Sequence, residues 1–257
     1  MQSDDSRIRL EHVSKRFPSG LHALEDVNLQ VAAGEFVSLL GPSGCGKSTV
    51  LRLVAGLDFP SSGRVDAPAL RREAAATTAF VFQDPTLMPW ASVFDNVYLP
   101  LRLAGRTRKE VAGPVADVLA LVGLDDFARS FPSELSGGMR MRASIARALV
   151  TQPQVLLMDE PFAALDEVTR NRLNLDLLAW WSARPLSVLF VTHSVFEAAF
   201  LSQRVLVMGV RPGHVVTELR IEQPYPRVAS FRGSTVFQQA CRELSAAIES
   251  VQQGAPA

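Results

Sequence analysis

The sequence predicts an α/β fold with a mostly parallel sheet, an antiparallel edge and an inserted helical segment. Short apolar runs, typical of strands buried on both faces, occupy residues 35–40, 154–158 and 187–192. Helical periodicity follows the first run at residues 47–57 and separates the other two runs at residues 168–183. Strands that alternate with helices in this way favour a mostly parallel sheet covered on both faces.

Residues 84–134 differ from the rest of the chain, because they carry helical periodicity and few strand signals. The other predicted elements are strands at 8–17 and 24–31, a helix at 136–150, a strand pair at 205–210 and 214–221, and a helix at 235–251. The last helix has apolar residues at helical spacing, and we expect it to fray from residue 252. The predicted boundaries are a core of residues 1–83 and 136–225, a helical subdomain of residues 84–135, and a C-terminal helix and tail of residues 226–257.

Composition restricts the function classes. The chain has 257 residues, 47% of them hydrophobic, and 26 basic residues balance 26 acidic ones. This balance argues against general nucleic-acid binding and against a polybasic membrane patch. Cys45 and Cys241 lie far apart and form no zinc or disulfide pattern, which favours a reducing compartment. We expect no signal peptide in the acidic first five residues and no bilayer span, so any membrane role needs a partner.

The strongest motif is a glycine-rich loop between an apolar strand and a helix. It fits the GxxxxGK[ST] pattern of P-loop NTPases with Gly41, Pro42, Ser43, Gly44, Cys45, Gly46, Lys47 and Ser48. Backbone N–H groups of such a loop bind phosphate oxygens, and its lysine reaches the β- and γ-phosphates. We therefore predict an ATP site in which Ser48 holds Mg²⁺ and Thr49 is a further phosphate contact. Cys45 is interpreted as a tolerated small residue rather than a redox switch.

A second acidic site follows the apolar run at 154–158. Asp159 would point at the Mg²⁺ shell, and Glu160 would orient the attacking water or accept its proton. The alternative is that Asp-Glu-Pro simply begins the next helix. The pair alone supports both interpretations equally, but its combination with the phosphate loop favours catalysis.

The segment Leu-Ser-Gly-Gly-Met-Arg at residues 135–140 completes a set of motifs. With the two sites above, it makes the chain resemble the nucleotide-binding domains of the ATP-binding cassette (ABC) family. The resemblance implies a RecA-like core and a dimer in which Ser136, Gly137 and Gly138 of one copy contact the ATP held by the other. An ordinary N-capped helix is the alternative for this segment taken alone.

Further positions match the family's motifs in order. The resemblance implies adenine stacking on Phe17, a contact from Gln83 to Mg²⁺ and the attacking water, an interface role for Asp166 and a γ-phosphate contact from His193. The chain departs from the family pattern at Met139, where glutamine is usual, and at Ser194 and Phe196, where acidic residues are common. Methionine cannot replace the hydrogen bonds of glutamine.

The resemblance also implies partners. Residues 87–97 look like those of the nitrate, sulfonate and taurine importer ATPases, and residues 192–198 look more like a branch linked to thiamine-precursor pyrimidine uptake. We therefore expect polytopic permease subunits, a second ATPase copy as a homodimer, an indirect link to an extracytoplasmic solute-binding protein, and a peripheral location on the cytoplasmic face of the inner membrane. A soluble ABC ATPase acting in cofactor assembly is the alternative. Met88, Pro89 and Trp90 are expected to form part of the groove for a permease helix, and simple packing of Trp90 and Phe94 is the competing interpretation.

Overall fold

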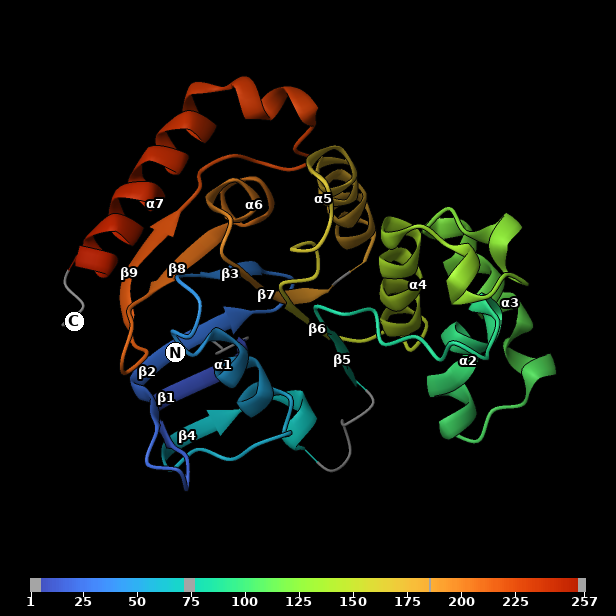
Figure 1. The fold of residues 1–257 in the computed structure, drawn as a ribbon, viewed down its shortest axis with the longest axis horizontal. Coiled ribbons are helices and arrows are strands. Elements are labelled where there is room, and N and C mark those ends of the chain that lie inside the picture. The colour runs from blue at the N-terminus through green and yellow to red at the C-terminus, as the bar shows by residue number, and fades with distance from the viewer. Residues whose placement is uncertain (1–5, 72–76, 185, 254–257) are drawn as a thin grey trace.

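The computed structural model describes residues 6–71, 77–184 and 186–253, so the expectation about residues 1–5 lies outside the described part. Its central sheet has the strand order β5-β6-β7-β3-β8-β9 (Figure 1). The strands are β3 (Phe36–Leu40), β5 (Thr78–Val81), β6 (Val155–Asp159), β7 (Ser187–Thr192), β8 (Arg204–Met208) and β9 (Val215–Arg220). Only the β8–β9 pair of this sheet is antiparallel, which confirms the predicted sheet with its antiparallel edge.

A second sheet of three antiparallel strands packs against one face of the central sheet. It has the order β2-β1-β4, formed by β1 (Ser6–Arg16), β2 (His22–Ala32) and β4 (Ser62–Asp66). Helix α1 (Lys47–Val54) shares the core between the two sheets. Val37 and Leu39 of β3 face this core, whereas Phe36 and Leu40 face the core on the other side. This alternation is the period of two expected for a strand buried on both faces.

The other face of the central sheet is covered by helices. These are α5 (Glu167–Ser182), α6 (Val195–Leu201) and α7 (Thr235–Gln253), which follows a short 3₁₀ turn at Ala229–Gly233. Figure 1 shows α7 arching over α6, with the segment before α7 reaching α5. Phe237, Leu244 and Val251 of α7 are buried, as their spacing predicts. Helix α7 extends to Gln253, two residues into the stretch that we expected to fray, and the rest of that stretch, residues 254–257, lies outside the described residues.

The inserted segment is helical, as predicted, and lies beside the sheet (Figure 1). It contains α2 (Val93–Leu103), α3 (Arg108–Leu121) and 3₁₀ turns at Asp125–Phe127 and Pro132–Glu134. Side-chain caps start both helices, from Ser92 for α2 and from Thr107 in a capping box for α3. Helix α4 (Gly137–Leu149) packs against α2 and α3 on one side and against β5 and α5 on the other. It therefore joins the inserted segment to the core, and the boundary between residues 135 and 136 stays a prediction.

Three elements were missed by sequence analysis. Strand β4 is exposed and has no apolar alternation, β5 has four residues, and α6 has seven residues that are mostly buried. Each element is too short, or too uniformly exposed or buried along its length, for the spacing of its apolar residues to indicate a strand or a helix. Helix α1 ends at Val54, three residues before the predicted end, where Ala55 donates to Leu51 and Leu57 turns back to Arg52.

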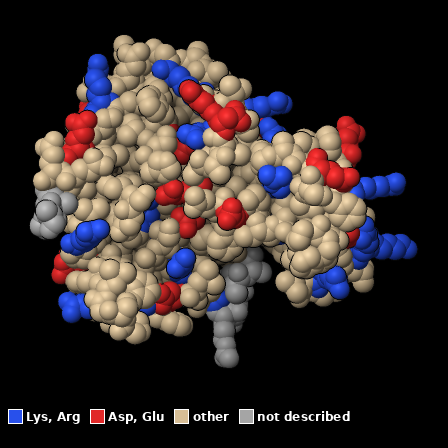
Figure 2. Space-filling model, in the orientation of Figure 1, with Lys and Arg blue, Asp and Glu red and all other residues tan. Residues whose placement is uncertain are grey.

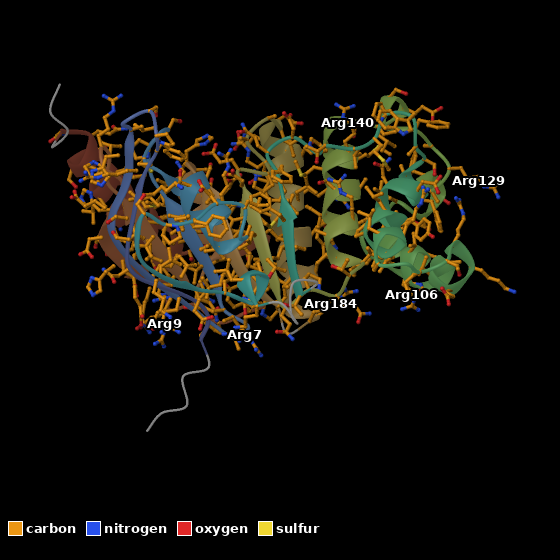
Figure 3. All side chains as sticks on the ribbon, turned by 90° about the horizontal axis from the view of Figure 1, so that it is seen from below. Arg7, Arg9, Arg106, Arg129, Arg140 and Arg184 are labelled. Atoms are coloured by element: carbon orange, nitrogen blue, oxygen red, sulfur yellow. The ribbon has the colours of Figure 1, made fainter. Side chains whose placement is uncertain are left out.

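The described residues contain no helix long and apolar enough to cross a membrane. On the face shown in Figure 2, Lys and Arg side chains are interspersed with Asp and Glu side chains. Figure 3 shows Arg140, near the start of α4, on the face opposite to Arg184, which precedes β7. The carboxyl end of β7 and the N-terminal end of α4 therefore point toward the same face.

Candidate functional site

The phosphate loop joins β3 to α1 and has the geometry of an anion site. Gly44 and Gly46 have φ of 79° and 94°, a region that favours glycine. A Cβ on Gly46 would lie 2.5 Å from Leu24 Cδ2, so only glycine fits there. Gly46 caps α1 without a side-chain hydrogen bond, which leaves backbone N–H groups of the first helical turn for a ligand.

Lys47 is buried within this loop. Its Nζ donates to the carbonyl oxygens of Gly41 at 2.8 Å and Pro42 at 2.9 Å, and lies 3.6 Å from Glu160 Oε1. The lysine side chain thus bends back over the phosphate loop, and its ammonium group lies near the carboxylate of Glu160, which directly follows β6. A phosphate in the loop would offer it stronger, doubly charged partners.

Ser48 and Asp159 meet at the base of the site, where Ser48 Oγ donates to Asp159 Oδ1 at 2.8 Å. Burial raises the pKa of Asp159, the hydrogen bond from Ser48 lowers it, and the neighbouring Glu160 raises it again. A partly buried carboxylate with one hydroxyl neighbour is the type of oxygen donor set that Mg²⁺ binds together with phosphate oxygens and water. The two side chains therefore fit Mg²⁺, and a bound cation would reverse the cost of burying Asp159.

Glu160 occupies an unusual backbone conformation. Its φ is 45°, which is rare for a residue with a side chain, and its N–H donates to Val191 O at 3.0 Å. Its carboxylate lies between Lys47 and His193, with 2.8 Å between Glu160 Oε2 and His193 Nδ1. The structure thus brings together three of the four predicted catalytic residues. Backbone strain of this kind is typical of functional sites and requires support from surrounding contacts.

The fourth predicted catalytic residue, Gln83, lies apart. It is exposed in the loop after β5, and within the described residues its side chain makes no hydrogen bond to Ser48, Asp159 or Glu160. Phe17 is also peripheral, in the turn between β1 and β2, where Lys15 Nζ lies 5.0 Å from its ring centroid. Lys15 is itself fixed by Asp58 at 2.5 Å and by the carbonyl of Phe59. Sequence analysis missed this support.

The Ser136 segment forms a separate surface. Ser136 caps α4 by accepting from Met139 N at 3.2 Å, and Asp166 caps α5 by accepting from Thr169 N at 3.0 Å. The two caps are neighbours, because a Cβ on Gly138 would lie 2.6 Å from Thr169 Cγ2. Ser136, Gly137, Gly138 and Asp166 therefore belong to one surface on α4 and α5 rather than to the phosphate loop of the same chain.

Sequence analysis also missed the residues that hold His193 in place. Thr192 Oγ1 donates to Glu197 Oε2 at 2.5 Å and accepts from Ser194 N at 2.9 Å. Ser194 in turn caps α6 by accepting from Glu197 N. Glu197 is 5% exposed and burial raises its pKa. The available signal was the Ser-x-x-Glu pattern of a capping box at residues 194–197.

Known proteins are similar to this chain over most of its length. The ABC transporter family model matches residues 24–163. The taurine import ATP-binding protein TauB of Rhizobium johnstonii is 46% identical over 221 residues, which cover 84% of this chain and 84% of that protein. The nitrate import ATP-binding protein NrtD of Synechocystis is 46% identical over 203 residues, covering 79% and 76% respectively.

Among solved structures, a dimeric ATP-binding cassette in a post-hydrolysis state bound to ADP and Pi has a TM-score of 0.74 at 32% identity. The match covers 84% of this chain and 100% of that one. The two chains therefore share a fold over most of this chain. The chain therefore belongs to the ABC transporter ATP-binding family, and it is an ATPase.

Proposed function

We propose that this chain is the ATP-hydrolysing subunit of an importer that takes up a small polar solute through separate membrane subunits. The observation that carries the proposal is the placement of Glu160 between Lys47 and His193, beside the Ser48–Asp159 pair. Relatives named for taurine and nitrate import, each 46% identical, support import and a small polar solute. The resemblance to a pyrimidine-precursor branch keeps that cargo class open.

Each residue then has a role that follows from its place. The loop 41–49 and the free N–H groups of α1 bind the triphosphate, and Phe17 stacks on adenine. Ser48 and Asp159 would hold Mg²⁺, with Gln83 as a third ligand implied by the resemblance, and the ion would supply positive charge beside the phosphates. Glu160 accepts a proton from the attacking water while His193 contacts the γ-phosphate. Lys47 exchanges Glu160 for phosphate oxygens on ATP binding, which frees the carboxylate for this task.

The surface of Ser136, Gly137, Gly138 and Asp166 completes the site of a second copy. It presents the N-terminal end of α4, which carries partial positive charge, away from its own phosphate loop. Two identical copies that face each other would enclose two ATP molecules, each between a phosphate loop and the opposite α4. The dimeric state of the post-hydrolysis cassette supports this arrangement.

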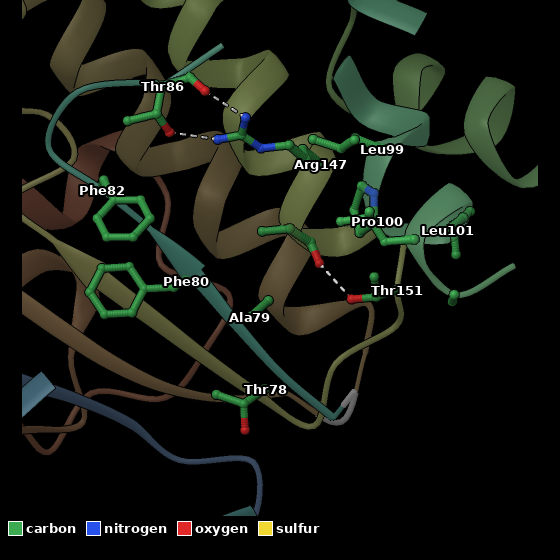
Figure 4. A pocket seen from close by; sticks show the side chains of 13 residues that line it. Thr78, Ala79, Phe80, Phe82, Thr86, Leu99, Pro100, Leu101, Arg147 and Thr151 are labelled. Carbon is green, nitrogen blue, oxygen red and sulfur yellow. Dashed lines mark hydrogen bonds between the residues drawn. The ribbon is translucent and has the colours of Figure 1, made fainter. Parts of the chain in front are cut away.

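A groove at the junction of the sheet and the helical subdomain suits a helix of the membrane subunit. It has a volume of about 590 Å³, and β5, α2 and α4 supply most of its apolar lining (Figure 4). Phe80 and Phe82 stack at 4.3 Å between ring centroids on one wall, and Leu103 is 80% exposed at the rim. Apolar grooves of this kind receive amphipathic helices.

Arg147 fixes the rear of this groove. It donates to the carbonyl oxygens of Pro85 and Thr86 at 2.8 Å each and to Thr86 Oγ1 at 2.9 Å (Figure 4). The segment held by Arg147 directly follows Gln83, so a helix in the groove contacts the same loop that carries Gln83. This connection would link permease movement to the nucleotide site.

The residues that sequence analysis expected to receive a permease helix lie outside the lining of this groove, and their contact with the permease stays a prediction. Met88, Pro89 and Trp90 are absent from its lining, and Trp90 is 77% exposed beyond it. Phe94 is partly buried, packing on Tyr98 and under Arg108. Packing within the chain thus accounts for the aromatic side chain at Phe94 but not for the exposed one at Trp90. We propose that Trp90 extends the surface that contacts the permease.

A pull-down of the tagged chain from detergent-solubilised native membranes tests the transport proposal. We expect a polytopic membrane protein to be recovered with the wild type and with Leu57→Glu, which changes a leucine that is 63% exposed elsewhere. Leu103→Glu should lose this partner, because a charge at the groove rim opposes burial of the permease helix. Recovery of soluble partners alone would refute transport and favour cofactor assembly.

Glu160→Gln tests the catalytic assignment separately. Glutamine keeps the size of the side chain but accepts no proton, so ATP should still bind while turnover falls by about 100-fold or more. The variant should also accumulate as an ATP-bound dimer in size-exclusion chromatography. Wild-type turnover in this variant would remove Glu160 from the role of base.

A further inference from the structure

The turn that carries Phe17 is connected to the phosphate loop through the start of β2. Phe17 N donates to Leu21 O at 2.9 Å, which closes the turn between β1 and β2. Leu24 in β2 contacts the loop, since a Cβ on Gly46 would lie 2.5 Å from Leu24 Cδ2. The extended chain from Leu21 to Leu24 spans about 10 Å, so one nucleotide could contact both the turn and the loop.

Lys15 holds the ring of Phe17 from one side. The lysine is 9% exposed, and its Nζ lies 5.0 Å over the ring centroid of Phe17. A cation over the face of an aromatic ring attracts the ring, most strongly where water is excluded. Phe17 itself is half-buried, and Pro18 and Ser19 after it are exposed. The lysine therefore restrains the ring, part of which stays accessible at the surface.

The ammonium group of Lys15 is in turn held by the segment that follows α1. Its Nζ donates to Asp58 Oδ1 at 2.5 Å and to Phe59 O at 2.7 Å. The hydrogen bond from Lys15 lowers the pKa of Asp58, so the carboxyl group is ionised at neutral pH and stays paired with the ammonium. Because a buried ammonium without partners is costly, these two acceptors determine where Nζ lies.

The same segment joins the two ends of the nucleotide site. Helix α1 begins in the phosphate loop at Lys47, and the chain leaves its C-terminal end just before Asp58. Ser61 then binds the end of β1, where its N donates to Ser14 O at 2.8 Å and its Oγ accepts from Arg16 N at 2.9 Å. Figure 1 shows α1 beside the sheet of β1, β2 and β4. One continuous segment therefore starts in the phosphate loop and ends on the strand that leads to Phe17.

We propose that Lys15 and Asp58 are positioning residues that hold the ring of Phe17 in the plane on which the base of the nucleotide stacks. The inference rests on the proposed stacking of adenine on Phe17. Stacking of a base on an aromatic side chain contributes a factor of about 5 to 150 in affinity. A ring that is free to turn loses much of this factor, because stacking needs two faces in contact. The pair thus acts on binding of the base and not on binding of the phosphates.

Isothermal titration of the full chain with Mg-ADP and with Mg-pyrophosphate separates these two parts, because both ligands carry a diphosphate and only ADP carries a base. We expect Phe17→Ala and Lys15→Met each to weaken ADP binding by about tenfold and to leave pyrophosphate binding within about twofold of the wild type. Asp58→Ala keeps the lysine and removes its carboxylate partner, so it should weaken ADP binding by a similar factor. Lys109→Met, which removes an exposed lysine of α3, is the matched control and should change neither affinity.

The double variant of Phe17→Ala and Lys15→Met gives the second measurement. If Lys15 acts through Phe17, ADP should bind the double variant no more weakly than it binds Phe17→Ala alone. Full additivity of the two losses, wild-type ADP affinity in Lys15→Met, or an equal loss of pyrophosphate affinity would overturn the inference. Unchanged ADP binding in Phe17→Ala would refute the proposed stacking, and this inference with it, so a failure of Lys15→Met alone is distinguishable from failure of the stacking.

Discussion

Arg227→Leu tests how the C-terminal segment is attached to the core. Arg227 is 3% exposed and donates to five backbone carbonyl groups. Nη1 contacts Ala199 at 3.2 Å, Phe200 at 3.0 Å and Ser202 at 2.9 Å, and Nη2 contacts Ile221 at 3.3 Å and Gln223 at 3.2 Å. The guanidinium thus joins the end of α6 to the chain that leaves β9.

The expected cost follows from these contacts. A hydrogen bond to a charged group contributes about 1.5–3 kcal/mol, and because the five contacts share two NH₂ groups we count two, which gives about 3–6 kcal/mol. Loss of a positive charge at the carbonyl end of α6 acts in the same direction. For a chain of this size, this free energy corresponds to a fall in Tm of about 6–24 °C.

Urea denaturation followed by tryptophan fluorescence provides the assay. Trp181 reports on the region because its ring lies 4.6 Å from that of Tyr225, over which Arg227 is placed. We expect Arg227→Leu to lower the midpoint by about 1 M urea or more at an unchanged slope. Arg220→Leu, which removes an exposed arginine of β9, is the matched control and should change stability by no more than about 0.5 kcal/mol. Equal midpoints for the two variants would refute the reasoning.

Three other predictions concern helices α4 and α6. Gly138→Ala places a Cβ 2.6 Å from Thr169 Cγ2, so it should lower the free energy of unfolding in urea by about 1–3 kcal/mol. Gly137→Ala is the control and should cost less, because the nearest contact of its Cβ, Leu165 Cδ2, is 3.4 Å away. Equal costs for the two variants would contradict the close packing of α4 on α5. Ser136→Ala removes the cap of α4 and should cost about 1 kcal/mol by the same measurement, and no loss would argue against the cap. Burial raises the pKa of Glu197 above its ordinary value of 4.5, so the folded state binds this proton more tightly than the unfolded state does. The resulting stabilisation is present at low pH and is lost as pH rises through the folded pKa. Glu197→Gln should remove this part of the pH dependence of the unfolding free energy, and identical pH profiles for variant and wild type would refute the reasoning.

Sequence patterns predicted the features that depend on residues close together in the chain, such as the buried strands and the motifs at their ends. The buried strands 36–40 and 187–192 appear as apolar runs because both faces of each strand are covered. The positions of the phosphate loop and of Asp159 and Glu160 follow from strand ends, so their meeting could be expected from the topology alone. The geometry agrees, since Ser48 contacts Asp159 and Lys47 approaches Glu160.

Features that depend on tertiary contact were not predictable. Nothing in the residues around Glu160 indicates a φ of 45°, since only the bond from its N–H to Val191 and the side-chain contacts hold it there. Strand β4 pairs with β1 although its first three residues are exposed, so its strand conformation comes from this pairing and not from an apolar pattern in its sequence. Arg227 was an unremarkable charge in the sequence because its partners are backbone carbonyls from distant segments.

The C-terminal segment is connected through α6 to the loop that carries His193. Helix α6 is held at its start by Glu197, which bonds Thr192 next to His193, and at its end by Arg227 of the segment that leads to α7. One short helix therefore connects His193 to the C-terminal segment. The arginine that stabilises the fold and the carboxyl that supports His193 thus contact the same helix of seven residues, so we expect a change in either to alter both stability and turnover.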